Sequence, residues 1–436
     1  MSEQTTGARN KKQIGLWIAT ALVVGNMIGS GIFLLPASLA PYGGVSIVGW
    51  LATTFGALMT ALVFVRLCRR FPRQGGPYRY ALENFGPLAG FMVTWSYWVS
   101  IWCGNAAISV ATVSYASYFF PQLSSSPLLA ISCSLALVWS ITLLNTLGVR
   151  KAGIFQLVTT ILKLLPLLII GLAAFWVFDV SAFKPFNPSG ESLPDAINAT
   201  AALTLWAFLG LESATIPAEN VRQPKKTIPR ATLLGFLIAA SVYIASQVSL
   251  MSVLPSDVMA RSEAPFADVA RVLWGDWAGS LIALGALISC IGALNGWILL
   301  QGQVPMTAAR DNLMPSILKD TRIPGVSITA LVFSSLLISF LVIANFSEGM
   351  VSLFTFAILI STLGIFIPYL LSVAASIRLT IMEWSEKRNY ISLLFSVFAL
   401  GYCLWAVAGV GVKAMQWGVV LLLAGLPIYW LVTRRS

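Results

Sequence analysis

The sequence predicts an all-α integral membrane protein with about twelve transmembrane helices. Of its 436 residues, 58% are hydrophobic and only 10% are charged, whereas a soluble globular domain carries about 25% charged residues. The apolar residues gather in long runs, and a helix that spans a bilayer needs about 20 of them. Strands of a membrane barrel would instead give short segments of alternating hydrophobicity. We therefore expect a single polytopic membrane domain that covers 1–436.

The candidate spans follow one another along the whole chain. Their expected ranges are 14–40, 44–67, 87–120, 127–148, 153–178, 196–217, 231–254, 276–304, 326–345, 351–377, 390–411 and 415–433. The first apolar run has no small-residue cleavage site and continues as a full span, so we expect it to be a transmembrane helix and not a cleaved signal peptide.

The lysine and arginine residues orient these spans. If the spans alternate, all but five of the 27 fall on one side of the membrane. The exceptions are Lys184, Arg261, Arg271 and Lys413 on the other side, and Lys163 inside a span. Because cytoplasmic loops carry the excess of Lys and Arg, both termini are expected in the cytoplasm. This distribution accounts for the net charge of +11 without a nucleic acid partner.

Residue usage argues against a metal site, a cofactor or an enzyme. Histidine is absent, and the five cysteines fall in or at the ends of spans without metal-ligand spacing. No paired intramembrane acids occur, and no Ser or Cys nucleophile is accompanied by a base. A channel would be expected to repeat a pore motif, and none is present. The sequence therefore favours a transporter of a small molecule, surrounded by membrane lipid.

Two spans are interrupted at matching positions of the two halves of the first ten. The first span contains Gly29-Ser30-Gly31, and the sixth is broken near Gly210 and followed by Pro217. Such matched interruptions indicate a binding site at the interface between structural repeats. Irregular backbone at membrane depth is tolerated only where it is buried or lines a water-filled cavity.

The interruption in the first span predicts an anion site. Unwound backbone there exposes N–H groups at the start of a half-helix, and these groups together with the helix dipole favour a carboxylate. The alternative is close helix packing by small residues, which is common in membranes. The neighbouring polar Asn26 and the matching break in the sixth span favour binding.

Two tryptophans and an asparagine are candidates for ligand contact. Trp206 and Trp297 lie mid-span, away from the interface belts where Trp is usually found, and their indole faces can bind a cation. The alternative for both is ordinary core packing. Asn105 is costly in lipid and should hydrogen-bond inside the bundle, either as a link between helices or as a ligand contact.

Two charged residues lie at membrane depth. A carboxylate there costs roughly 2.5 to 3.5 kcal/mol on insertion scales, so Glu212 should face a partner, a cavity or a substrate path. Its protonation would bias the sixth span between arrangements, or it is a permanently protonated acid that bonds backbone near Gly210. The Lys163 ammonium can hold carbonyls of the broken first span as a bound sodium ion would; the alternative is that it snorkels to an interface.

These motifs together resemble the amino acid–polyamine–organocation (APC) transporter superfamily. The resemblance is closest to the bacterial basic amino acid/polyamine antiporters, especially the arginine/agmatine type, and covers nearly the whole chain. It is carried by Gly25–Pro36, Tyr97-Trp98 with Gly104-Asn105, Leu205-Trp206 with Gly210–Ala214, Gly296-Trp297 with Leu299-Leu300, and Ile367–Leu370.

The resemblance implies a fold of five plus five helices in inverted repeats, roughly 14–178 and 196–377, with two added helices in 390–433. It also implies a bacterial inner membrane and a homodimer. The implied substrate-binding residues are Ile28, Ser30, Gly31, Ser100, Asn105, Trp206, Leu209, Trp297 and Ser361. In this set Ser30 and Gly31 hold a carboxylate, Trp206 stacks on the cationic or aliphatic part, and Asn105, Ser100 and Ser361 bond the distal group.

The resemblance also implies gating by Tyr97, Trp206 and Trp297, and proton coupling by Glu212. Lys163 departs from the arginine/agmatine type, which has an apolar residue there. It resembles instead the fifth-helix lysine of proton-coupled or sodium-independent amino acid transporters of the superfamily, and we include it among the proton-coupling residues.

Two functions follow as expectations. The first is secondary active exchange of a cationic, arginine-like amino acid for its decarboxylated amine or another amino acid, by alternating access. The second is proton-coupled or exchange transport of small neutral amino acids, because apart from Glu212 the expected site has no carboxylate to pair with a guanidinium.

Overall fold

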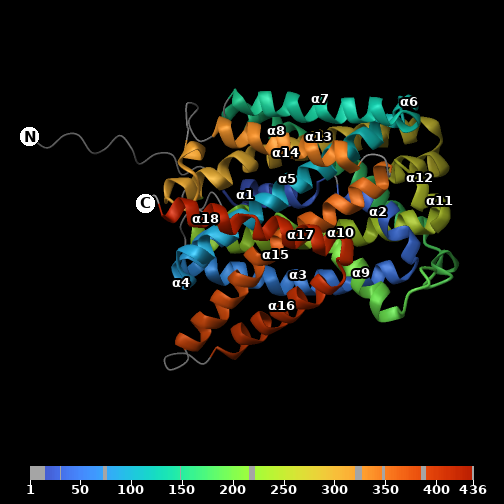
Figure 1. Cartoon of the computed structure of the whole chain (residues 1–436). Helices are drawn as coiled ribbons and strands as arrows, with labels where there is room; N and C mark the ends of the chain where they lie inside the picture. The colour runs from blue at the N-terminus through green and yellow to red at the C-terminus, as the bar shows by residue number, and fades with distance from the viewer. Residues whose placement is uncertain are drawn as a thin grey trace, which may run out of the picture.

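The computed structural model describes residues 15–29, 31–71, 76–147, 149–215, 221–319, 327–345, 349–383 and 389–434. In these ranges the long helices lie alongside one another in a single bundle (Figure 1). The short helices α4 and α18 lie at one end of the bundle, and α6, α11 and α12 lie at the opposite end (Figure 1).

The first half of the chain supplies the first five spans and their connections. Its helices are α1 (Leu16–Met27), α2 (Gly31–Leu39), η1 (Ala40–Tyr42), α3 (Val45–Arg70), α4 (Pro77–Phe85), α5 (Pro87–Ser117), α6 (Gln122–Ser125), α7 (Pro127–Thr146), α8 (Val149–Val177) and η2 (Val180–Phe183), where η denotes a 3-10 turn.

The second half continues the same architecture. Its helices are α9 (Leu193–Leu205), η3 (Trp206–Phe208), η4 (Ser213–Thr215), α10 (Pro224–Val253), α11 (Ser256–Arg261), α12 (Pro265–Trp274), α13 (Asp276–Arg310), η6 (Ser316–Lys319), α14 (Ile328–Asn345), α15 (Met350–Met382), α16 (Tyr390–Ala408), α17 (Val412–Leu423) and α18 (Gly425–Thr433).

The expected all-α membrane fold is confirmed. Within the described ranges, nine helices are long and apolar enough to cross a membrane, counting α1 with α2 and α17 with α18 as one each. The other three expected spans correspond to α8, α14 and the interrupted α9. α8 and α14 carry shorter apolar stretches, Leu165–Val177 and Ile328–Ala344.

Local sequence signals explain where several helices begin. Ser126 accepts a hydrogen bond from the N–H of Leu129 at the start of α7, and Ser192 accepts one from Asp195 at the start of α9. Asn389 does the same for Ser392 at the start of α16. Each side chain satisfies one N–H of the first turn, which has no partner inside the helix.

The centre of the bundle is α5, which packs against α15 and α13 along most of its length. Close approach of α5 and α15 depends on Gly364. A Cβ atom at this position would lie 2.8 Å from both the main-chain nitrogen of Ser100 and the carbonyl oxygen of Ser96. Because backbone atoms of a buried helix cannot move aside cheaply, only glycine fits.

Polar side chains also link the buried faces of α5, α7, α13 and α14. Asn145 of α7 donates to Asn295 Oδ1 of α13 at 3.1 Å, and the Trp98 indole of α5 donates to Ser334 Oγ of α14 at 2.8 Å. Hydrogen bonds of this kind join helices where lipid offers no alternative partner.

Ion pairs gather at the end of the bundle that carries α4. Arg66 Nη2 of α3 lies 3.2 Å from Glu383 Oε2 beyond α15. The Tyr78 hydroxyl of α4 donates to Asp311 Oδ2 beyond α13 at 2.5 Å. Burial, and next the bond to Asp311, raise the pKa of Tyr78, so this hydroxyl stays a donor at neutral pH. These contacts tie α3 to the end of α15 and α4 to the end of α13.

Candidate substrate-binding site

The first span is broken between α1 and α2. The Ile28 N–H still bonds the carbonyl of Val24, but the Gly29 N–H bonds Met27 at 2.9 Å and not Gly25, as a continuous helix would require. The carbonyl oxygen of Gly25 is thereby released, and the ammonium of Lys163 on α8 donates to it. Lys163 is fully buried, so snorkelling to an interface does not describe this side chain.

The sixth span is broken beside the first. α9 ends at Leu205, η3 follows, and Leu209 adopts an extended conformation with ψ 138°. Gly210 then has a φ of +101°, a conformation that disfavours any side chain. Its α carbon also packs so closely on α1 that an added Cβ would lie 3.0 Å from Asn26. The Asn26 amide donates to Ser213 Oγ at 2.8 Å, which links the two breaks.

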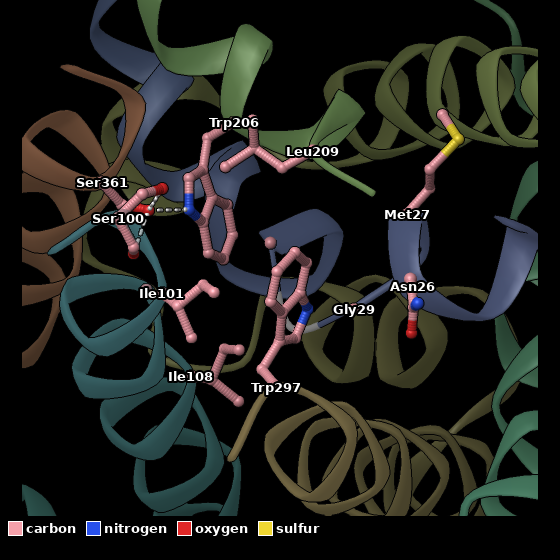
Figure 2. A pocket seen from close by; sticks show the side chains of 12 residues that line it. Asn26, Met27, Gly29, Ser100, Ile101, Ile108, Trp206, Leu209, Trp297 and Ser361 are labelled. Atoms are coloured by element: carbon pink, nitrogen blue, oxygen red, sulfur yellow. Dashed lines mark hydrogen bonds between the residues drawn. The ribbon is translucent and has the colours of Figure 1, made fainter. Parts of the chain in front are cut away.

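A pocket lies where the two breaks meet α5, α13 and α15. Its lining residues are Asn26, Met27, Gly29, Gly31, Ser100, Ile101, Gly104, Ile108, Trp206, Leu209, Trp297 and Ser361 (Figure 2). The cavity measures about 30 Å³, which has room for only a few water molecules. An amino acid therefore enters only if lining side chains move.

Trp206 forms one wall of this pocket and is fixed at three points. Its indole N–H donates to Ser361 Oγ at 3.2 Å, and its ring meets Phe354 edge-on at 5.7 Å. Its six-membered ring packs against the α carbon of Gly31 so closely that a Cβ there would lie 2.2 Å from Cζ3. Figure 2 shows the indoles of Trp206 and Trp297 reaching into the same space from opposite sides.

The serine pair behind Trp206 joins α5 to α15. Ser361 donates to the carbonyl of Ser100 at 2.8 Å, and the two hydroxyl oxygens are 3.1 Å apart. Because the Ser361 proton is used on that carbonyl, its oxygen accepts from both Trp206 and Ser100. These bonds fix the orientation of the Trp206 indole in the pocket (Figure 2).

Glu212 lies beside the sixth-span break and is completely buried. Three donors meet its carboxyl group: the hydroxyl of Tyr97 at 2.7 Å, the hydroxyl of Tyr369 at 3.0 Å and the N–H of Gly210 at 3.2 Å. The group thus joins the broken backbone to α5 and α15, and a gain or loss of its proton changes all three bonds.

The structure brings together most of the predicted residues. Gly31, Ser100, Trp206, Leu209, Trp297 and Ser361 all line the pocket. Ile28 is fully buried and is not among the lining residues, and Ser30 lies outside the described residues. Asn105 also lies outside the lining set; its amide donates to Gln301 Oε1 at 2.7 Å. Tyr97 also lies outside the lining set, and its hydroxyl donates to Glu212.

Sequence reasoning missed several residues of this region. Met27, Ile101 and Ile108 line the pocket but carry no chemical signal in the sequence. Tyr369 and Gln301 are polar groups inside apolar spans, and that placement was the available signal. Their partners Glu212 and Asn105 are far away along the chain, so the sequence alone does not pair them.

The lining residues carry no formal charge. What the pocket wall offers a ligand is aromatic faces, hydroxyl groups and the start of α2 at Gly31. A flat indole face attracts cations, and a half-helix N-terminus attracts anions. A zwitterion or amino acid with a positive distal group matches both.

Residues 14–432 match the family model described as amino acid permease. The chain belongs to the amino acid permease family. Among the permease's relatives is the cadaverine/lysine antiporter of Escherichia coli strain K12, which is 36% identical over 404 residues that cover 91% of this chain and 90% of the relative. The putative arginine/ornithine antiporter of Bacillus subtilis strain 168 is 32% identical and covers 97% of this chain and 98% of its own. The arginine/ornithine antiporter of Pseudomonas aeruginosa PAO1 is 31% identical, with coverage of 96% and 91%.

A solved structure agrees on the fold of the permease. The substrate-bound, outward-open state of a Na⁺-coupled sialic acid symporter superposes with a TM-score of 0.57 at 12% identity and covers 92% of this chain and 91% of that one. At this identity the likeness concerns the fold alone.

Proposed function

We propose that this permease is a secondary active exchanger of a cationic, arginine-like amino acid for its decarboxylated amine or another amino acid, working by alternating access. The observation that carries the proposal is the 31–36% identity, over more than nine-tenths of the chain, to relatives named as cadaverine/lysine and arginine/ornithine antiporters. The site is built for such a substrate in two ways.

The first is a place for the α-carboxylate. In the proposal it binds at Gly31 and Ser30, where α2 begins and its first N–H groups have no helical partners. The second is a place for the cationic or aliphatic part, which stacks on the indole of Trp206. Ser100 and Ser361 then bond the distal group. Ile28 and Leu209 supply apolar contact, and Asn105 also bonds the distal group.

The proposed cycle requires gates. The cavity of about 30 Å³ is a closed arrangement, and substrate entry needs rotation of Trp206 or Trp297 together with release of Tyr97 from Glu212. Glu212 is the proton-sensitive group, because its three donors come from the break and from two other helices. Lys163 holds the break in place of a sodium ion and completes the pair of proton-coupling residues.

The remaining features belong to the same proposal. The permease is a multi-pass protein of a bacterial inner membrane with both termini in the cytoplasm, as the lysine and arginine distribution favours. It is a transporter and not an enzyme, works as a homodimer in contact with lipid, and consists of inverted repeats at roughly 14–178 and 196–377 followed by two added helices in 390–433.

A second candidate function rests on one specific observation, the lack of charge among the lining residues. Without a carboxylate at the pocket wall, small neutral amino acids would also fit, and transport would then be proton-coupled or an exchange among neutral substrates.

Uptake of labelled substrates into proteoliposomes separates the two candidates. Purified permease is reconstituted, and arginine, lysine, leucine and alanine are compared at equal concentration, with protein-free liposomes as the background. The proposal expects arginine or lysine to be taken up well above leucine and alanine. Preferred uptake of leucine or alanine would replace it with the second candidate.

A further inference from the structure

A series of hydrogen-bonded side chains, which links α5, α13 and α14, lies one helical turn from the pocket. The Asn105 amide of α5 donates to Gln301 Oε1 of α13 at 2.7 Å. The Gln301 amide in turn donates to Ser335 Oγ at 3.1 Å and to the carbonyl of Leu331 at 3.4 Å, both on α14. Asn105, Gln301 and Ser335 are all fully buried.

The bonds at α14 fix which atoms donate and which accept in this series. A main-chain carbonyl can only accept, so the end of Gln301 that faces Leu331 is its NH₂ group. The Ser335 hydroxyl donates to the same carbonyl at 2.9 Å, so its oxygen is left to accept from Gln301. The oxygen of Gln301 must then face Asn105, and the NH₂ group of Asn105 must face Gln301.

The other end of Asn105 is consequently an acceptor. Its Oδ1 atom is buried and has no hydrogen-bond partner in the part of the chain that the structure describes. An acceptor left unpaired in a membrane interior is costly, so a ligand that brings a donor to this oxygen would bind more tightly.

The residues around Asn105 place this oxygen beside the pocket, where a ligand can supply such a donor. Ile101 and Ile108, one turn to either side of Asn105 on the same face of α5, both line the pocket, as does the adjacent Gly104. On α13, Trp297 lies one turn from Gln301 and also lines it. Because the cavity is too small for an amino acid, an indole has to move, and movement of Trp297 opens space towards the turn that holds Asn105.

We propose that Gln301 is a positioning residue that holds the Asn105 amide with its oxygen free to accept from the distal N–H donors of the substrate. The inference rests on the proposed function and specifies its substrate class. A guanidinium or an ammonium group offers donors only, and so matches a lone acceptor. The ureido group of citrulline has the shape of a guanidinium but replaces one nitrogen group with a carbonyl oxygen, so it offers fewer N–H donors and carries no positive charge.

This arrangement gives selectivity for cationic side chains without a carboxylate in the pocket. The position of Asn105 beside the pocket also distinguishes its bond to Gln301 from bonds that only join helices. The pair Asn145–Asn295 is another buried amide–amide bond to α13, and Asn145 Oδ1 also has no partner in the described ranges. Asn145, however, does not line the pocket or flank a lining residue on α5. Loss of that bond loosens the bundle without touching the acceptor.

The test measures the ratio of binding affinities for arginine and citrulline in purified full-length permease, with lysine and norleucine as a second pair. Gln301→Met keeps the length of the side chain and removes the acceptor that orients Asn105. We expect the ratio to fall by about tenfold, which corresponds to about 1.4 kcal/mol. Asn105→Ala is expected to lower the ratio by the same factor, and the double variant by no more than either single variant.

One control keeps the result specific. Asn145→Leu is expected to lower the melting temperature and leave the ratio at its parent value. Gln301→Leu replaces Gln301→Met should the latter not be recovered as a folded protein.

The inference would be overturned if the parent permease prefers arginine to citrulline and folded Gln301→Met retains that preference, or if the losses in the double variant add. If the parent protein binds citrulline as tightly as arginine, and norleucine as tightly as lysine, the cationic substrate class of the proposed function itself is contradicted. The two failures are therefore distinguishable.

Discussion

The Lys163 ammonium donates to the carbonyl oxygen of Gly25, the group whose usual helical partner, the Gly29 N–H, bonds Met27 instead. A single cation from α8 thus compensates the break in the first span, at a place where a bound metal ion would do the same. The proposed anion site at α2 depends on the shape of this break.

Transport is accordingly expected to be independent of sodium. Lys163→Ala should impair transport in a folded protein, because the carbonyl of Gly25 is then left without a donor in the membrane interior. Initial uptake rates in sodium-containing and sodium-free buffer, for the parent, for Lys163→Ala and for the exposed control Lys226→Ala, check this. A clear sodium requirement of the parent, or full activity of Lys163→Ala, would contradict the role given to Lys163.

Glu212 is expected to make exchange pH-dependent. Its proton competes with the bonds from Tyr97, Tyr369 and Gly210, so protonation loosens the link between the sixth-span break and α5 and α15. Glu212→Gln cannot titrate and should give a flat pH profile while still binding substrate. The measurement is a pH series of exchange rates for the parent, Glu212→Gln and the exposed control Glu191→Gln. A glutamine variant with the parent's pH profile would leave Glu212 with a purely structural role.

Trp206→Leu should weaken substrate binding by roughly 1–3 kcal/mol if a desolvated cation stacks on the indole. The serine pair and the start of α2 remain in this variant, so binding is reduced and not abolished. Equilibrium binding to purified protein measures the effect, and Trp176→Leu serves as the control because Trp176 is 81% exposed. Equal affinity of Trp206→Leu and the parent would remove Trp206 from the site.

Gly364→Ala should destabilise the permease by about 1–3 kcal/mol through overpacking. The added methyl group would press on the backbone of α5 at Ser100 and so shift a pocket residue, and substrate affinity should fall as well. Gly401→Ala on α16 meets no atom within 4 Å and is expected to be neutral or to stabilise by up to about 1 kcal/mol. Thermal melting in detergent compares the two variants; similar melting temperatures would argue against close packing of α5 on α15.

The sequence predicted the helices and the two breaks well because both depend on local properties. Apolar runs of sufficient length give the spans, and Gly29 and Gly210 mark where the backbone leaves the helix. The segment 255–275, between two of the expected spans, forms α11 and α12. These helices are short and carry Asp257, Arg261, Asp268 and Arg271, so their sequences do not predict membrane spans.

The sequence alone did not predict which polar side chains pair with one another. Asn105 was expected to bond either a helix or the ligand, and the structure gives it Gln301, 196 residues away along the chain. The Glu212 partner Tyr369 is 157 residues away. Such pairs depend on how helices pack across the bundle, which the hydropathy of each span does not encode. The inverted repeats and the roles of the site residues remain predictions.

The central claim is exchange of cationic substrates, and trans-stimulation tests it most directly. Proteoliposomes are prepared empty, with internal agmatine or cadaverine, with internal arginine or lysine, and with internal leucine, and the initial uptake of labelled arginine and lysine is measured. An exchanger of cationic substrates is expected to take up label rapidly when a cationic amino acid or amine is inside, and slowly when the vesicles are empty or loaded with leucine. Equal uptake into empty and loaded vesicles, or stimulation by internal leucine alone, would contradict it.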